Sequence, residues 1–240
     1  MKKHIPNFIT TLNLTSGFVA IIFASSGELT TASWLILAAM IFDFLDGFSA
    51  RLLKAYSDLG KQLDSLADVV SFGVAPGIII YQLLNESLTL YAPSFVNSTS
   101  VIPTLILILP AVMPVCAALR LAIFNLDSSQ ATTFKGLPTP ANALSVISVI
   151  IASQYSKSEI LSSFISSPAL LILFTLTLSI LMVSRIPLLS LKANDLKIRG
   201  NEGRYILVLL IITGFISVGI MAFPLIIPLY IVASLLSLMF

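Results

Sequence analysis

Long apolar segments alternate with short polar ones along this chain, and the lengths of the apolar segments predict membrane-spanning helices. These segments cover about residues 7–26, 32–53, 62–85, 101–125, 139–155, 168–188, 204–221 and 224–239. A helix needs roughly 20 mainly apolar residues to cross the hydrocarbon core of a bilayer, and most of the segments approach that length. We therefore predict an all-α fold, a polytopic transmembrane helix bundle of about eight spans. Six spans is the alternative count, because the segments 139–155 and 224–239 are short.

Composition supports the same class of protein. Of the 240 residues, 57% are hydrophobic and only 10% are charged, and the mean hydropathy is +1.03. Such values are typical of a membrane protein rather than a soluble domain. No stretch interleaves basic and aromatic residues as a nucleic-acid-binding surface does, so we expect no nucleic acid partner. His4 is the only histidine and Cys116 the only cysteine, which argues against a histidine metal site and excludes an intramolecular disulfide.

The basic residues are distributed unevenly between the two sides that eight spans would define. Twelve of the thirteen Lys and Arg residues fall in the N-terminal segment and in alternate loops, and only Lys157 falls on the other side. Cytoplasmic loops carry the excess of basic residues in membrane proteins. We therefore predict a multi-pass protein of the cell (inner) membrane with both termini cytoplasmic. The segment 86–100 has no Lys or Arg and is expected to be external.

Four aspartates in the second and third apolar segments are the strongest candidates for chemistry. Asp43 and Asp46 are three positions apart, and Asp64 and Asp68 are four apart, so each pair shares one face of its helix. The residues between the pairs can turn the chain so that the two faces meet. Four carboxylates that converge repel one another unless a cation lies among them. Oxygen ligands suit Mg²⁺ or Mn²⁺, and two ions fit four carboxylates better than one.

The same stretch carries a longer pattern, Asp43-x2-Asp46-Gly47-x2-Ala50-Arg51-x8-Gly60-x3-Asp64-x3-Asp68. At all eight fixed positions it resembles the signature of the CDP-alcohol phosphotransferase family. The resemblance implies an enzyme in which an alcohol displaces CMP from the β-phosphorus of a CDP-lipid. It also implies a homodimer, and the distribution of basic residues places the active site at the cytoplasmic side. We expect the catalytic membrane domain to cover residues 1–190, with a basic cytoplasmic loop and two C-terminal transmembrane helices in residues 191–240.

For the aspartates, the resemblance implies two overlapping metal sites. Asp43, Asp46 and Asp64 would hold one ion, and Asp43, Asp64 and Asp68 would hold the second at the reacting phosphate. Asp68 is also expected to act as the general base that takes the proton of the attacking hydroxyl. Metal ligation alone is the alternative role of Asp68.

For the CDP-lipid, the resemblance implies five binding residues, which are Asp46, Gly47, Ala50, Arg51 and Gly60. Gly47 and Ala50 lack bulk and would let the nucleotide approach the helix backbone closely. Arg51 can pair with phosphate through its planar guanidinium. Gly60 would permit a tight turn or a close contact beside the nucleotide.

Four further strings resemble the branch of this family that uses L-serine as the acceptor: Ser71–Pro76, Arg120–Asn125, Phe134–Pro140 and Met182–Pro187. This branch transfers the phosphatidyl group of CDP-diacylglycerol to the serine hydroxyl, giving phosphatidylserine and CMP. The branch commonly has a basic residue where this chain has Ile123.

The carboxylate of L-serine needs a cation outside the acidic cluster. Arg120, Lys135 and Arg185 are the candidates. Their alternative roles are to orient the protein in the membrane or to reach its interface as snorkelling side chains.

Several alternatives stay open on the sequence alone. Within the family, the acceptor could be glycerol 3-phosphate or an inositol phosphate, which would require several basic residues around the pocket. Outside it, a cation transporter would use the aspartates as an ion path, with acids spread through the membrane depth. Asn7 is expected to be a cap or turn residue, and Asn13 to contact the nucleotide or to support helix packing. Pro76 is expected to kink the third helix.

Overall fold

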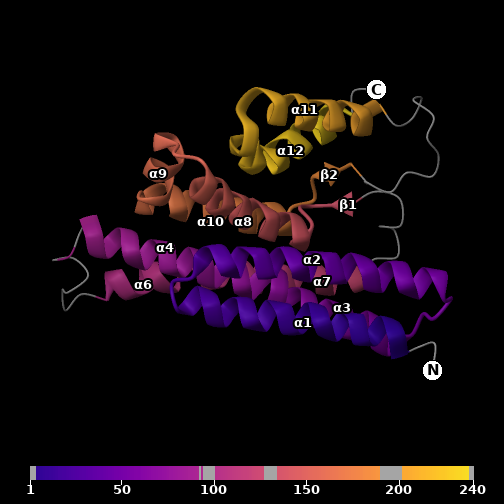
Figure 1. The fold of residues 1–240 in the computed structure, drawn as a ribbon. Coiled ribbons are helices and arrows are strands. Elements are labelled where there is room, and N and C mark those ends of the chain that lie inside the picture. The colour runs from indigo at the N-terminus through magenta and orange to yellow at the C-terminus, as the bar shows by residue number, and fades with distance from the viewer. Residues whose placement is uncertain (1–3, 92, 94–100, 127–133, 190–201, 238–240) are drawn as a thin grey trace.

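The computed structural model describes residues 4–91, 93, 101–126, 134–189 and 202–237. Nearly all of them are helical (Figure 1). The elements in chain order are α1 (His4–Ser25), α2 (Leu29–Leu52), α3 (Asp58–Asp68), the π-helix η1 (Val69–Val74), α4 (Ala75–Tyr91), α6 (Ile102–Ile108), the 3₁₀-helix η2 (Leu109–Ala111), α7 (Val112–Leu126), β1 (Phe134–Lys135), α8 (Thr139–Tyr155), α9 (Glu159–Ile165), α10 (Pro168–Val183), β2 (Pro187–Leu188), α11 (Glu202–Val218), the 3₁₀-helix η4 (Gly219–Leu225) and α12 (Ile226–Leu236).

A helix or a continuous helical run occupies each of the predicted apolar segments, so the all-α class is confirmed. Four described helical runs are long and apolar enough to cross a membrane: 4–25, 58–90, 102–126 and 203–236. A fifth is reached if α9 and α10, which meet at an 81° bend, count as one span. The chain is thus a multi-pass membrane protein, and the count of eight stays a prediction.

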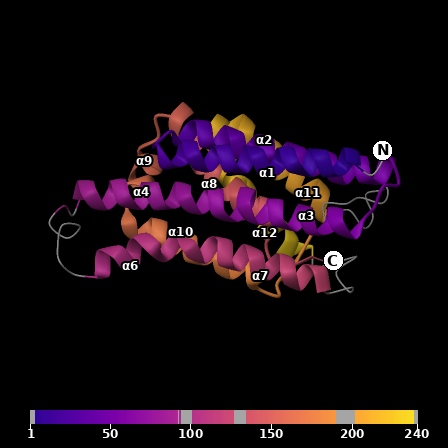
Figure 2. The ribbon, with the colours of Figure 1, turned by 90° about the horizontal axis from the view of Figure 1, so that it is seen from below.

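The helices form three stacked groups. In Figure 1, α1, α2, α3, α4, α6 and α7 lie roughly parallel in the lower group, α8, α9 and α10 lie above them, and the α11–α12 hairpin lies at the top. Figure 2 shows the lower group from below, with α1 and α2 beside the α3–α4 run and the α6–α7 run next to it. The start of α1, the end of α2, the start of α3 and the end of α7 lie at one end of the molecule, and α9 lies at the other.

Helix α8 forms the centre of the molecule. Nine consecutive residues, Ser145 to Ser153, are buried or half-buried whichever side of the helix they occupy. A helix that is buried all round needs no polar face, which explains why α8 shows no amphipathic pattern. Large apolar side chains on α1, α2, α7, α10 and α11 are exposed instead, including Phe18, Phe44, Leu119 and Ile180, as expected of surfaces that face lipid.

The π-helix η1 directly follows Asp68 and ends two residues before Pro76, and the kink expected at Pro76 stays a prediction. The Ala75 N–H bonds the Val70 carbonyl, five residues earlier. Pro76 has no N–H to donate to the Phe72 carbonyl four residues earlier, and Nδ2 of the buried Asn142 on α8 donates to that carbonyl at 2.9 Å. The distortion is therefore fixed by a partner on the central helix, a common arrangement where π-turns serve functional sites.

Small residues bring α1 against η1. A Cβ at Gly17 would lie 2.7 Å from the Ser71 Cα and would also clash with the Ser71 hydroxyl. Any side chain at Gly17 would thus push α1 away from the segment that follows Asp68. Small residues commonly allow such close helix contacts in membrane proteins.

Candidate active site

Three aspartates of the predicted motif converge between α2 and α3. One carboxylate oxygen from each of Asp43, Asp64 and Asp68 lies within 4.8 Å of the other two. Because α2 carries Asp43 and α3 carries the other two, the predicted meeting of the two helix faces is confirmed. Asp43 and Asp64 are half-buried, and Asp68 is buried. Carboxylates this close repel one another where water is scarce, so the cluster favours a cation.

Two carboxylate oxygens at this site have no hydrogen-bond partner among the described residues. They are Oδ2 of Asp46, whose side chain is only 5% exposed, and Oδ1 of Asp64. An enclosed, unpaired carboxylate oxygen is costly, and a bound divalent cation would supply the missing partner. The oxygen donor set suits a hard divalent ion. The residues present therefore fit a metal site, although Asp46 stands outside the closest group of three.

A buried asparagine from α1 binds Asp68. Asn13 has no exposed surface, and its Nδ2 donates to Asp68 Oδ1 at 3.3 Å. The backbone carbonyl of Asn13 accepts a hydrogen bond from Ser71 Oγ at 3.1 Å. Asn13 was expected either to contact the nucleotide site or to support helix packing. Its bond to Asp68 supports the first role, and the bond from Ser71 supports the second.

A cavity of about 880 Å³ opens beside the acidic cluster. Every residue that was predicted to bind the CDP-lipid lines it: Asp46, Gly47, Ala50, Arg51 and Gly60. The volume is in the range of small-molecule sites. No neighbouring atom lies within 4 Å of the place where a Cβ of Gly47 would stand. The backbone of α2 is therefore open to a ligand at Gly47.

The N-terminal turn of α3 packs against α1 at this cavity. The Gly60 N–H donates to Oγ of the capping Ser57 at 3.0 Å, and a Cβ at Gly60 would lie 2.9 Å from Asn7 Oδ1. Gly60 thus permits a close contact, and its neighbour there is Asn7. The expectation that Asn7 is a cap or turn residue is wrong, because α1 begins at His4 and Asn7 lies within it.

Arg51 is one of the cationic residues that line this cavity, together with Lys61. Its Nε donates to the Gly47 carbonyl one turn earlier at 3.0 Å. The side chain is exposed and lines the cavity. The bond fixes the side chain along α2 and leaves the guanidinium with further donors for an anionic ligand.

A second cavity, of about 420 Å³, brings together the three residues predicted to bind the acceptor, Arg120, Lys135 and Arg185. Arg120 is buried, and its Nη1 donates to the Lys135 carbonyl at 2.8 Å. Lys135 and Arg185 are exposed. Three cationic side chains around one cavity favour an anionic ligand. Ile123, where the related branch commonly has a basic residue, lines the same cavity.

The two cavities adjoin the same turn of α7. Ile123 lines the second cavity and the next residue, Phe124, lines the first. This turn is bound to α3, because Lys61 Nζ donates to the Asn125 carbonyl at 3.2 Å and Asn125 Nδ2 donates to Ser65 Oγ at 2.8 Å. Ligands in the two cavities would therefore lie on neighbouring sides of one helix end.

Some residues of the site were missed by reasoning from the sequence. The first cavity is also lined by Pro6 and Thr10 of α1, by Tyr56 and by Lys61. A signal for the α1 residues does exist, because Pro6, Thr10, Asn13 and Gly17 are polar or small and recur at helical spacing along one buried face. Tyr56 and Phe124 carry no such signal.

These features define a class: a polytopic helical membrane protein with an acidic cluster able to hold a divalent cation, next to a cavity lined by small residues and an arginine. The family model for CDP-alcohol phosphatidyltransferase matches residues 3–188. The chain belongs to this family.

Characterised relatives extend the match. The chain is 34% identical over 184 residues to the CDP-diacylglycerol–serine O-phosphatidyltransferase of Bacillus subtilis, covering 77% of this chain and 89% of that protein. It is 33% identical over 211 residues to the Helicobacter pylori protein of the same name, covering 87% and 79%. It is also 34% identical over 184 residues to the archaetidylserine synthase of Methanothermobacter thermautotrophicus, covering 76% and 68%.

Proposed function

We propose that this protein transfers the phosphatidyl group of CDP-diacylglycerol to the hydroxyl group of L-serine, forming phosphatidylserine and releasing CMP. The observation that carries the proposal is the convergence of Asp43, Asp64 and Asp68 beside a cavity that all five predicted CDP-lipid residues line. Relatives named for transfer to serine, similar over most of the chain, support the choice of reaction.

In this proposal the first cavity holds the CDP part of the donor lipid. Gly47 and Ala50 leave the α2 backbone accessible, and Arg51 pairs with phosphate. Asp43, Asp46, Asp64 and Asp68 would hold Mg²⁺ or Mn²⁺, with two ions as the proposed number. Bound there, divalent cations would neutralise the pyrophosphate and stabilise the CMP leaving group.

Asp68 is the proposed general base. One of its oxygens is engaged by Asn13, which orients the carboxylate while the second oxygen can accept the proton of the serine hydroxyl. The hydroxyl oxygen of serine then attacks the β-phosphorus, and the bond between this phosphorus and the oxygen of the CMP leaving group breaks. Proton acceptance by a positioned carboxylate contributes about 10²–10⁴-fold to such reactions.

The second cavity is the proposed site of the acceptor. Arg120 would pair with the serine carboxylate, with Lys135 and Arg185 at the rim. Arg120 is the strongest candidate, because it is 7% exposed and its Nη1 is already fixed on the Lys135 carbonyl. A buried guanidinium held in place binds a carboxylate with less loss of conformational entropy than a mobile one.

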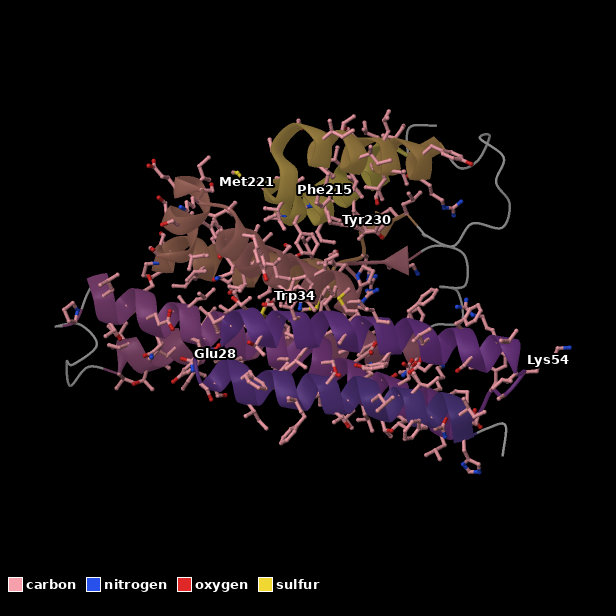
Figure 3. The ribbon with its side chains drawn as sticks, viewed as in Figure 1. Glu28, Trp34, Lys54, Phe215, Met221 and Tyr230 are labelled. Atoms are coloured by element: carbon pink, nitrogen blue, oxygen red, sulfur yellow. The ribbon has the colours of Figure 1, made fainter. Side chains whose placement is uncertain are left out.

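The orientation in the membrane is also a proposal. We propose eight spans, with both termini and the two cavities at the cytoplasmic side. Lys54 would then lie at the cytoplasmic end of α2, and Glu28 at the opposite end (Figure 3). Lys157 follows α8 beside α9, at the end away from the acidic motif. A homodimer in the cell membrane is part of the same proposal and rests on the resemblance to the family.

A phosphorylated acceptor is the second candidate, because three basic residues around the second cavity would also suit a phosphate group. A cation transporter is less well supported, because the acids cluster in one place rather than along the membrane depth.

The test is release of CMP from CDP-diacylglycerol by purified protein, with serine, glycerol 3-phosphate or inositol phosphate, before and after chelation of divalent metal. We expect CMP release that depends on divalent metal and that occurs with serine but with neither of the other two acceptors. Release only with a phosphorylated acceptor would overturn the choice of serine, and no release with any of them would overturn the enzyme.

A further inference from the structure

The C-terminal hairpin of α11, η4 and α12 follows the residues that the family model matches, 3–188. Its sequence carries no motif that the proposed function uses. Two polar side chains of α12 nevertheless face inward. Tyr230 is 6% exposed and Ser234 is 1% exposed, and Figure 3 shows Tyr230 between the hairpin and the helices beneath it. Polar side chains on a membrane helix lie where other parts of the protein supply hydrogen-bond partners, so the partners of these two residues identify what α12 holds.

Both residues bind the same amino acid, Leu189. The Tyr230 hydroxyl donates to the Leu189 carbonyl at 2.9 Å, and the Leu189 N–H donates to Ser234 Oγ at 3.1 Å. The Ser234 hydroxyl donates in turn to the Tyr230 carbonyl at 2.6 Å. Because Tyr230 and Ser234 are one helical turn apart, α12 holds both backbone polar groups of Leu189 at once.

Leu189 directly follows β2, the strand that comes after the second-cavity residues Met182–Arg185. β2 pairs antiparallel with β1, with Lys135 opposite Pro187 and Phe134 opposite Leu188. The Gly136 N–H extends the pairing by donating to the Ile186 carbonyl at 2.9 Å. Gly136 has a φ of +76°, and a Cβ there would lie 2.6 Å from the Ser184 carbonyl oxygen. Only glycine allows this close joining of the two strands.

The pairing ends at the cations of the second cavity. Arg185 precedes β2, Lys135 lies in β1, and the Lys135 carbonyl accepts the hydrogen bond from Arg120. Hydrogen bonds from α12 to Leu189, between the two strands and from Arg120 to the Lys135 carbonyl therefore join α12 to the segments that carry the three cationic residues.

We propose that Tyr230 and Ser234 are positioning residues that fix the cationic wall of the second cavity, so that the C-terminal hairpin sets the affinity for the acceptor. This inference rests on the proposed function of the second cavity. Without the two hydrogen bonds on Leu189, β2 would move relative to α12, and the guanidinium of Arg185 and the carbonyl that orients Arg120 would move with it. The donor cavity has no lining residue from β1, β2 or α12 and should keep its affinity.

The test compares Tyr230→Phe and Ser234→Ala with the wild-type protein in the CMP-release assay, with serine and CDP-diacylglycerol varied in turn. We expect the KM for serine to rise about threefold to tenfold, the loss for one or two buried hydrogen bonds. The kcat, the KM for CDP-diacylglycerol and the thermal unfolding midpoint should change little. Tyr155→Phe is the matched control, because Tyr155 is 58% exposed and lines neither cavity.

A double-mutant cycle identifies the route of the effect. If Tyr230 acts on the acceptor through Arg120, then Tyr230→Phe should add little in an Arg120→Ala background, because coupled residues are not additive. An equal rise of both KM values, a fall in kcat alone, or an unchanged serine KM would each overturn the inference while the proposed function stands. If the wild-type protein used glycerol 3-phosphate or inositol phosphate in place of serine, the proposed acceptor would be wrong, and the KM for that acceptor would decide the role of Tyr230.

Discussion

Asn13 and Asp68 stand 55 positions apart in the sequence, and the side-chain amide of Asn13 donates to a carboxylate oxygen of Asp68 at 3.3 Å. The Asn13 backbone carbonyl is bound by Ser71, three residues beyond Asp68. A helix at the start of the chain therefore holds the proposed base and the segment that follows it. This bond links the fold of α1 to the chemistry proposed for α3.

Replacement of Asn13 by Ala should lower kcat by about tenfold or more, because a hydrogen bond to a charged group contributes about 1.5–3 kcal/mol. Binding of CDP-diacylglycerol should persist, since Asn13 does not line the first cavity. The measurements are CMP release and nucleotide binding by calorimetry. Thr15→Ala is the control, because the exposed Thr15 hydroxyl bonds only to its own helix. An unchanged kcat would leave Asn13 with a packing role alone.

Substitution of Asp68 separates a base from a metal ligand. Asp68→Asn keeps the shape of the side chain but cannot accept a proton at neutral pH, so turnover should fall by about 10² or more. Nucleotide binding in the presence of Mg²⁺ or Mn²⁺ should survive, while Asp43→Asn should weaken metal and nucleotide binding together. Calorimetry and CMP release over a metal titration test both variants. Recovery of Asp68→Asn to near wild-type turnover with extra metal would make Asp68 a ligand only.

Two glycines of the first cavity should respond differently to alanine. Gly47→Ala meets no neighbouring atom and should stabilise α2 by about 0.5–1 kcal/mol, yet it should raise the KM for CDP-diacylglycerol. Gly60→Ala should bring no such gain in stability, because its Cβ would lie 2.9 Å from Asn7 Oδ1 and the Asn7 side chain would have to rotate away. Thermal unfolding and donor titration distinguish the two. An unchanged donor KM in Gly47→Ala would argue against close approach of the nucleotide to α2.

Replacement of Arg120 by Ala should raise the KM for serine at least about tenfold, since a charge-assisted hydrogen bond is lost. The KM for CDP-diacylglycerol should stay near the wild-type value, because Arg120 lines the second cavity and not the first. Initial rates of CMP release with each substrate varied provide the measurement. A rise confined to the donor KM would assign Arg120 to the lipid-nucleotide site.

The orientation can be tested with single cysteines at exposed lysines on opposite ends of the molecule. In a Cys116→Ala background, Lys157→Cys should react with a membrane-impermeant maleimide added to intact cells, and Lys54→Cys should react only after the membrane is opened. The expectation follows from the excess of basic residues on the side of Lys54. Labelling of Lys54→Cys from outside would reverse the orientation and move the acidic site to the external face.

Local patterns in the chain were enough to predict several features. Apolar segments of about 20 residues predict helices, because in lipid a helix satisfies its own backbone hydrogen bonds. The spacing of Asp43 and Asp46, and of Asp64 and Asp68, predicts shared helix faces, because that geometry depends only on the helical repeat. The need of a serine carboxylate for a counter-charge likewise indicated Arg120, Lys135 and Arg185 as candidates without any knowledge of the fold.

Only the tertiary structure decided which of these residues meet. Arg120, Lys135 and Arg185 come from α7, β1 and the segment before β2, and they line one cavity beside the paired strands. The bond from Asn13 to Asp68 and the hold of Tyr230 on Leu189 join residues 55 and 41 positions apart. No local pattern records such pairs, since they depend on how whole helices pack. The physical reason is that periodicity specifies the face of a helix, whereas packing of small residues such as Gly17 against Ser71 specifies the neighbour that this face meets.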